Sequence, residues 1–143
     1  MASVTVTVKA QITNPLGDVE PITSAVYTQT FTAKYDQTWS LSDTVAVTAW
    51  DPTAATAAAT NFDFLYIETD ATAGVHAEFV TNKGSTAAAT DTKLIMKNLP
   101  LMLGSDDSFS ASGFAGSLDV IDKVSFVNPT AGTTVSVRLV LLT

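Results

Sequence analysis

The chain has no cysteine and only one histidine, His76, among its 143 residues. The missing cysteine excludes disulfides, thiolate nucleophiles and cysteine-type zinc sites. A Ser-His-Asp triad or a histidine-rich metal site would have to depend on His76 alone. This residue falls out of phase with the apolar Val75, Ala77 and Phe79, a pattern that predicts a solvent-facing position on a strand. We therefore expect no enzymatic activity, no catalytic residue and no cofactor.

Charged residues are also scarce. They make up 15% of the chain, against about 25% in a typical soluble domain. Seven basic residues, of which Arg138 is the only arginine, stand against fourteen acidic ones, and the formal net charge is −7. Such a field repels a phosphate backbone, and the sequence has no basic patch interleaved with aromatic residues. We expect no direct binding to nucleic acid.

Long apolar runs are missing as well. None reaches the roughly 18 residues that a transmembrane helix needs, and no charged segment followed by an apolar one resembles a secretory leader. We expect no membrane association, and synthesis in the cytoplasm with an unprocessed N-terminus. Yet 46% of the residues are hydrophobic and the mean hydropathy is +0.27. This composition implies either a generous core or an apolar surface that meets a partner.

The clearest positive signal lies in residues 121–143, where two strand-like runs surround the turn sequence NPTAG. The second run alternates with period two, which is typical of a half-buried strand. Its apolar face comprises Val135, Val137, Leu139 and Leu141, and its polar face comprises Thr134, Ser136 and Arg138. The pattern predicts a closing hairpin. Because Val140 and Leu142 make both faces apolar at the end, we expect this end to run under another layer or into a neighbouring subunit.

Strand candidates recur along the rest of the chain, with turn signals between them. They cover residues 3–12, 25–35, 38–50, 61–69, 74–81, 92–96 and 108–114. With the terminal pair this gives about eight strands, which is dense enough for an all-β sandwich or barrel. The length fits a single domain over residues 1–143.

Two alanine- and threonine-rich segments, residues 53–60 and 85–90, allow two interpretations. They are either paired loops that dock on a partner or simple loop filler, and we favour filler because alanine-rich composition alone implies no contact.

Carboxylates offer little chemistry. Asp106, Asp107, Asp119 and Asp122 could supply oxygens to calcium, but no EF-hand spacing is present. Aspartate-rich turns also form because Asp bonds to its own backbone, so we favour solvated turns and expect no metal site. No pair of carboxylates is marked out for glycoside hydrolysis.

The segment 99–103 gathers apolar side chains beside a proline, either as a loop that docks on a partner or as a crossover that plugs the core. Together with the chain end, the interface candidates are Leu99, Pro100, Leu101, Met102, Leu103, Val140, Leu141 and Leu142. Trp39 and Trp50 either stack on a sugar or pack in the core, and we favour packing because an indole buries a large area.

Three stretches carry a resemblance to a family: residues 62–70 (FDFLYIETD), 99–106 (LPLMLGSD) and 120–142. They resemble small structural proteins of tailed bacteriophage virions, in particular the capsid decoration (cement) proteins. The resemblance implies an antiparallel β-sandwich with jelly-roll-like topology that forms a homo-oligomer, with a trimer favoured. It also implies location in the virion and binding to the major capsid protein or other virion proteins.

From this resemblance we expect a non-enzymatic decoration protein that binds and stabilises the outer shell. The alternative is a carbohydrate-binding β-sandwich module, on a virion fibre or spike or secreted, that uses Trp39 and Trp50.

Overall fold

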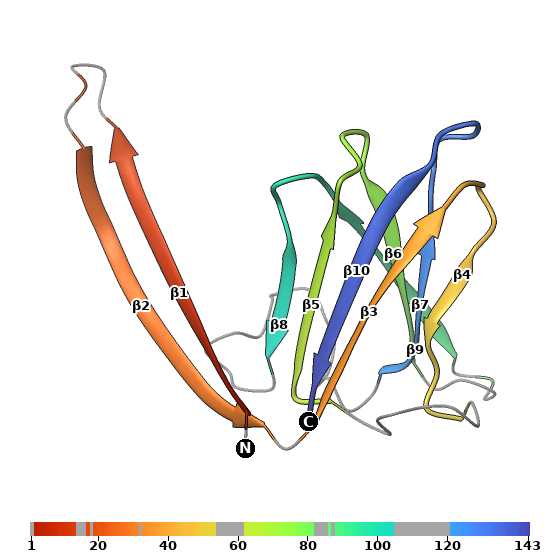
Figure 1. Ribbon diagram of the computed structural model, residues 1–143, viewed down its shortest axis with the longest axis horizontal. Helices are drawn as coiled ribbons and strands as arrows, with labels where there is room; N and C mark the ends of the chain where they lie inside the picture. The colour runs from red at the N-terminus through yellow and green to blue at the C-terminus, as the bar shows by residue number, and fades with distance from the viewer. Residues whose placement is uncertain are drawn as a thin grey trace. The chain divides into compact units, whose positions relative to one another are not determined.

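A computed structural model describes residues 2–13, 17, 19–31, 33–53, 62–81, 86, 88–104 and 121–143. All regular structure in this part of the chain is β-strand, as predicted (Figure 1). The chain divides into two compact units, Met1–Thr32 and Ala33–Thr143, which are described separately. That residues 1–143 form a single domain stays a prediction.

The first unit is a long antiparallel hairpin. It consists of β1 (Ala2–Thr13) and β2 (Val19–Phe31), with a register shift between Ala10 and Gln11. Gly17, in the connection, has a φ of 89°, a conformation that glycine adopts without steric cost. Valine and threonine alternate along β1, which suits the pleated backbone.

The second unit is an antiparallel β-sandwich of two four-stranded sheets (Figure 1). Its strands are β3 (Lys34–Leu41), β4 (Val47–Trp50), β5 (Phe64–Thr69), β6 (Val75–Thr81), β7 (Ala89–Ile95), β8 (Leu101–Gly104), β9 (Ile121–Val127) and β10 (Val135–Leu142). One sheet has the order β3-β10-β5-β8 and the other β4-β9-β6-β7. Among the described strands of this unit, only β6 and β7 are neighbours both in the chain and in a sheet.

The core lies between the two sheets and follows the predicted alternation. Val137, Leu139 and Leu141 of β10 are fully buried, as are Leu65 and Ile67 of β5. The opposite sheet adds the fully buried side chains Val75, Ala77, Phe79, Val124 and Phe126. The predicted apolar face of β10 is therefore confirmed.

The predicted closing hairpin is wrong. β9 and β10 follow each other in the chain but belong to different sheets, so the turn between them is an arch across the sandwich. Hydrogen bonds from Asn128 stabilise this arch. Its buried side-chain Nδ2 donates to the carbonyl oxygens of Thr133 (2.8 Å) and Leu41 (3.4 Å). Its Oδ1 accepts from the N–H of Thr130 at 3.0 Å.

Two predicted strands are also corrected. The run 25–35 is divided, because β2 ends at Phe31 and β3 begins at Lys34. The run 38–50 is divided between β3 and β4 by a turn in which Asp43 Oδ1 accepts from the N–H of Thr44 at 2.7 Å. Apolar alternation continues through the first break, from Phe31 through Ala33 to Tyr35, so the sequence does not reveal it. The second break falls at the polar run 42–44, whose Asp43 is a turn signal that the prediction did not use. The candidate strand 108–114 lies outside the described residues.

The end of β10 is enclosed on both faces. Val140 and Leu142 lie on the face opposite Leu139 and Leu141, yet they are only 9% and 2% exposed. Just beyond them, the backbones of Ala33 and Thr143 exchange two hydrogen bonds of 3.2 Å. The expectation that this end is apolar and covered on both sides agrees with these values.

Removal of residues 139–143 should therefore abolish folding. Replacing one buried leucine by alanine costs about 2–5 kcal/mol, and this deletion removes three buried aliphatic side chains besides Val140 and the ladder bonds to β3 and β5. The loss exceeds the roughly 5–15 kcal/mol by which a domain is stable. Circular dichroism during heating should show no cooperative transition.

The milder change Leu139→Ala should leave a cooperative transition at a lower temperature, whereas Leu99→Ala at an exposed position should barely move it. A truncated chain that unfolds like the full chain would contradict the central position of β10.

Candidate interaction surface

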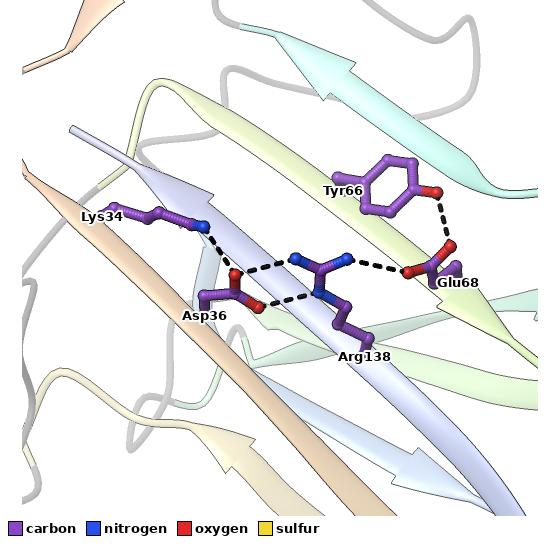
Figure 2. A network of polar contacts seen from close by, with 5 residues as sticks. All are labelled: Lys34, Asp36, Tyr66, Glu68 and Arg138. Atoms are coloured by element: carbon purple, nitrogen blue, oxygen red, sulfur yellow. Dashed lines mark hydrogen bonds and ion pairs between the residues drawn. The ribbon is translucent and has the colours of Figure 1, made fainter. Parts of the chain in front are cut away.

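A network of charged side chains crosses three strands on the outer face of the sheet β3-β10-β5-β8. Arg138, on the central strand β10, donates from Nε and Nη2 to the two oxygens of Asp36 on β3, both at 2.9 Å. Its Nη1 donates to Glu68 Oε1 on β5 at 3.1 Å. Figure 2 shows the guanidinium lying between the two carboxylates. The arrangement arises because Arg138 stands opposite Glu68 in the register of β10 and β5.

Two further side chains close the network. Lys34 Nζ lies 2.6 Å from Asp36 Oδ2, and the Tyr66 hydroxyl donates to Glu68 Oε2 at 2.8 Å (Figure 2). Two cations therefore balance two carboxylates, and all four carboxylate oxygens accept a hydrogen bond.

The electrostatics follow from these contacts. Hydrogen bonds from Arg138 and Lys34 hold the pKa of the Asp36 carboxyl well below its ordinary range. The hydrogen bonds from Arg138 to Asp36 and to Glu68 raise the pKa of Arg138. Burial, followed by the hydrogen bond to Glu68, raises the pKa of the Tyr66 hydroxyl. The paired Asp36 carboxylate does not readily accept a proton. The geometry of the network suits a structural link across three strands.

An open hollow of about 360 Å³ lies beside the network. Its polar groups are largely engaged with the backbone: Thr69 Oγ1 donates to the Ser136 carbonyl at 2.7 Å, and Asp70 Oδ1 accepts from the Ser136 N–H at 2.7 Å. The lining residues are Thr38, Glu68, Thr69, Asp70, Lys97, Asn98, Ser136 and Arg138.

Exposed apolar side chains gather where β7 leads into β8. Leu94 is 54% and Leu99 67% exposed, and Met96 is also exposed. Leu94 and Met96 share a face by alternation, and Met96 pairs with Leu99, whose N–H donates to the Met96 carbonyl at 3.0 Å. We call Leu94, Met96 and Leu99 the apolar corner. Single exposed leucines are ordinary, but three grouped residues are informative.

The apolar corner depends on a nearby glycine. Gly74 has a φ of 88°, and a Cβ atom built on it would lie 2.6 Å from Leu94 Cδ1. A side chain at position 74 would therefore strain the backbone and push Leu94 aside.

The two interpretations of the segment 99–103 each fit part of it. Leu99 and Pro100 are exposed, Leu101 and Met102 of β8 are half-buried, and Leu103 is buried in the core. The candidates Val140, Leu141 and Leu142 are buried in the central strand β10. An interface role for these residues stays a prediction.

The two tryptophans pack within the sandwich. Trp50 is 3% exposed and meets Phe62 edge-on, with ring centroids 5.1 Å apart. Trp39 is half-buried, meets Phe126 edge-on at 5.8 Å and lies 6.4 Å from the ring of Tyr35. Of the two, only Trp39 is accessible for stacking on a sugar, and a carbohydrate-binding role stays a prediction.

The other candidates are placed as follows. His76 is half-buried on β6, paired with Leu94 and Val127 in the register of its sheet. Asp122 is half-buried on β9, while Asp106, Asp107 and Asp119 lie outside the described residues. Residues 54–60, 85 and 87 of the two alanine- and threonine-rich segments also lie outside them, and Ala89 and Thr90 begin β7. Within the described ranges, no three His, Asp or Glu side chains converge on a metal position.

None of the described residues belongs to a helix long and apolar enough to cross a membrane.

Sequence reasoning placed Arg138 on the polar face of its strand but missed its partners. The one available signal was that the only arginine of an acidic chain lies on a predicted strand. Its partners Asp36 and Glu68 are 102 and 70 positions away from it in the sequence. Only the order β3-β10-β5 brings them together.

Comparisons of the chain with protein-family models, with curated proteins and with solved structures find no match.

Arg138→Ala should destabilise the sandwich, because Asp36 and Glu68 then lie on one sheet face without the guanidinium between them. Lys93→Ala is the matched control, because it removes the same charge from an ion pair with Asp91 on the edge strand β7. We expect a larger fall in the thermal midpoint for Arg138→Ala. Equal falls would show that net charge alone matters.

Stability should also fall in acid partly through Asp36. Because its pKa is lower in the folded chain than its ordinary value of 3.8, the unfolded chain binds this proton at the higher pH. The stabilisation is therefore present above about pH 4 and is lost as the pH falls below it. Chemical denaturation of the wild type and Asp36→Asn should differ at neutral pH, and the difference should shrink progressively as the pH falls below about 4 toward the lower pKa of the folded chain. A constant difference would contradict the pairing.

Proposed function

We propose that this chain is a non-enzymatic structural protein of a virus particle, of the decoration (cement) type. It binds the outer shell of a tailed-bacteriophage capsid as an oligomer, with a trimer favoured, and its direct partner is the major capsid protein. The observation that carries the proposal is the apolar corner formed by Leu94, Met96 and Leu99.

The position of the apolar corner favours docking on a broad surface. β7 is an edge strand of one sheet and β8 an edge strand of the other, so the turn between them joins the edges of both layers. Side chains there are reached by a flat partner without any opening of the sandwich. Three exposed apolar residues give a small patch, which suits one contact repeated many times over a shell.

Charge explains why this patch can act selectively. The β7 edge carries Asp91 and Lys93, and charged edge strands discourage pairing with a strand of another chain. Docking at the corner therefore uses side chains. The net charge of −7 repels nucleic acid and favours a basic patch on the shell.

The jelly-roll topology is part of the proposal. Its support is the pair of strand orders, β3-β10-β5-β8 and β4-β9-β6-β7, in which the chain crosses repeatedly between two four-stranded sheets. Double-sheet jelly rolls of eight strands are common in viral capsid domains.

Binding of this kind stabilises a shell by mass action. A protein that binds the assembled lattice better than its separated subunits shifts the equilibrium toward the lattice. If one subunit binds two neighbouring shell proteins, those proteins can separate only when one of its two contacts breaks as well. No covalent step is required.

Leu99→Asp should weaken binding to capsids that lack the protein, because a carboxylate would be buried in an apolar contact. We expect a loss of about tenfold or more in affinity in a sedimentation assay. Val45→Asp is the matched control, because Val45 is similarly exposed (65%) but lies between β3 and β4. It should bind as the wild type does.

A wild-type protein that ignores such capsids would refute the proposal. Binding that is lost on Trp39→Ala and kept by Leu99→Asp would favour the carbohydrate-binding alternative.

A further inference from the structure

We propose that one end of the sandwich binds carbohydrate, a neutral ligand rich in hydroxyl groups, in a site formed by two hollows that share Asp70. The connections β5–β6, β7–β8 and β9–β10 lie at the same end of the sandwich (Figure 1). The hollow of about 360 Å³ beside the charged network and a second hollow of about 350 Å³ are both lined by Asp70. The inference goes beyond the proposed function and does not depend on it.

The second hollow lies between the turn after β5 and the arch before β10, and small side chains line it. Four of them are threonines, whose hydroxyls can both donate and accept a hydrogen bond. Ala73 and Val135 add apolar surface, against which the C–H groups of a sugar ring can pack. The threonines are Thr72, Thr130, Thr133 and Thr134.

Hydrogen bonds hold the walls of both hollows in place. The Ala71 carbonyl oxygen accepts from the N–H of Lys97 at 3.0 Å, which joins the β5–β6 turn to the β7–β8 turn. In the arch, Thr133 Oγ1 donates to the Thr130 carbonyl oxygen at 2.9 Å, beside the bonds of the buried Asn128. A preformed site of this kind loses little conformational entropy when a ligand binds.

The first hollow also presents polar groups that have no partner among the described residues. The bond from the Ser136 N–H uses only Oδ1 of Asp70 and leaves Oδ2 for a ligand. The Lys97 ammonium, the Asn98 side-chain amide and the hydroxyls of Thr38 and Ser136 likewise make no hydrogen bond or ion pair within the described ranges. A ligand with both donors and acceptors can replace the water on these groups.

Charge around the site favours a neutral ligand. Lys97 and Arg138 balance Glu68 and Asp70 in the first hollow, although the whole chain carries a net charge of −7. Among the described residues, Asp70 is the only charged one that lines the second hollow. An anion would therefore meet two carboxylates, and a cation would meet two fixed positive charges. A sugar hydroxyl carries no charge, yet it can donate to Asp70 and accept from Lys97.

The size and composition of the hollows favour a short oligosaccharide over a protein segment. Pockets for small molecules occupy about 300–1,000 Å³, and each hollow lies at the small end of this range, while the shared Asp70 lets one sugar chain reach both. Aromatic side chains, which dominate contacts between proteins, line neither hollow in the described part of the chain. Because the hollows are open and polar, we expect weak binding, with a Kd of about 1 mM.

A glycan array tests the site in the full chain. Fluorescently labelled protein should bind neutral oligosaccharides and leave sialylated and sulfated ones at background. Asp70→Asn should lower the bound signal about tenfold or more, because it replaces the unpaired carboxylate oxygen by an amide while Oδ1 can still accept from Ser136. Asp43→Asn is the matched control, because Asp43 Oδ1 also accepts from a backbone N–H at 2.7 Å but lies outside both hollows. It should bind as the wild type does.

Lys97→Ala separates loss of binding from loss of folding. The Lys97 side chain is exposed, so its removal should leave the thermal midpoint unchanged and lower the array signal severalfold. A wild type that binds no neutral oligosaccharide overturns the proposal, and so do Asp70→Asn and Lys97→Ala variants that bind as the wild type does. Binding that is lost on Trp39→Ala and kept by Asp70→Asn also overturns it, because the sugar then lies at the tryptophan.

The array and the capsid assay report on different residues. Leu94, Met96 and Leu99 line neither hollow, so Leu99→Asp should bind the array as the wild type does. Failure on the array leaves the capsid-binding test unaffected, and failure of the capsid-binding test leaves the carbohydrate site standing.

Discussion

The sandwich depends on the pairing of β10 with both β3 and β5. One eight-residue strand at the end of the chain joins segments that lie about a hundred and about seventy positions earlier. The same strand places Leu139 and Leu141 in the core and Arg138 on the outer face. A slip of one residue in its register would exchange these faces, burying the guanidinium and exposing the leucines. Core packing and the charged network therefore specify one register together.

The two contributions differ in kind. Burial of the leucines is the larger contribution to stability. Each buried leucine contributes about 2–5 kcal/mol, whereas the free energy of unfolding of a whole domain is only about 5–15 kcal/mol. The network of Arg138, Asp36 and Glu68 lies at the surface, where water screens it. Its geometry is nevertheless demanding, because the guanidinium reaches both carboxylates only when three strands align. We infer that the core provides stability and the network discriminates between registers.

Alternation in the sequence predicted the strands and their buried faces, because period two is a local property. It did not predict which strands pair. β9 and β10 read as a hairpin, since a short turn between two strands looks the same whether the chain turns back in one sheet or crosses to the other. The difference lies in Asn128, whose amide reaches Leu41 across 87 positions. The segment 99–103 shows the same limit: its apolar run allowed either a contact or a place in the core. The structure places Leu103 in the ladder of β8 with β5, where it is buried, and Leu99 in the turn before β8, where it is exposed.

Charge also explains where an acidic chain can associate. On the outer face of β3, β10 and β5, two cations form ion pairs with two carboxylates. This network therefore leaves none of its own four charges unpaired for a partner. Among the described residues, exposed apolar side chains gather instead at the apolar corner. Under the proposed function, the contact with the shell therefore falls at this corner, and the negative charge of the sandwich suppresses other contacts.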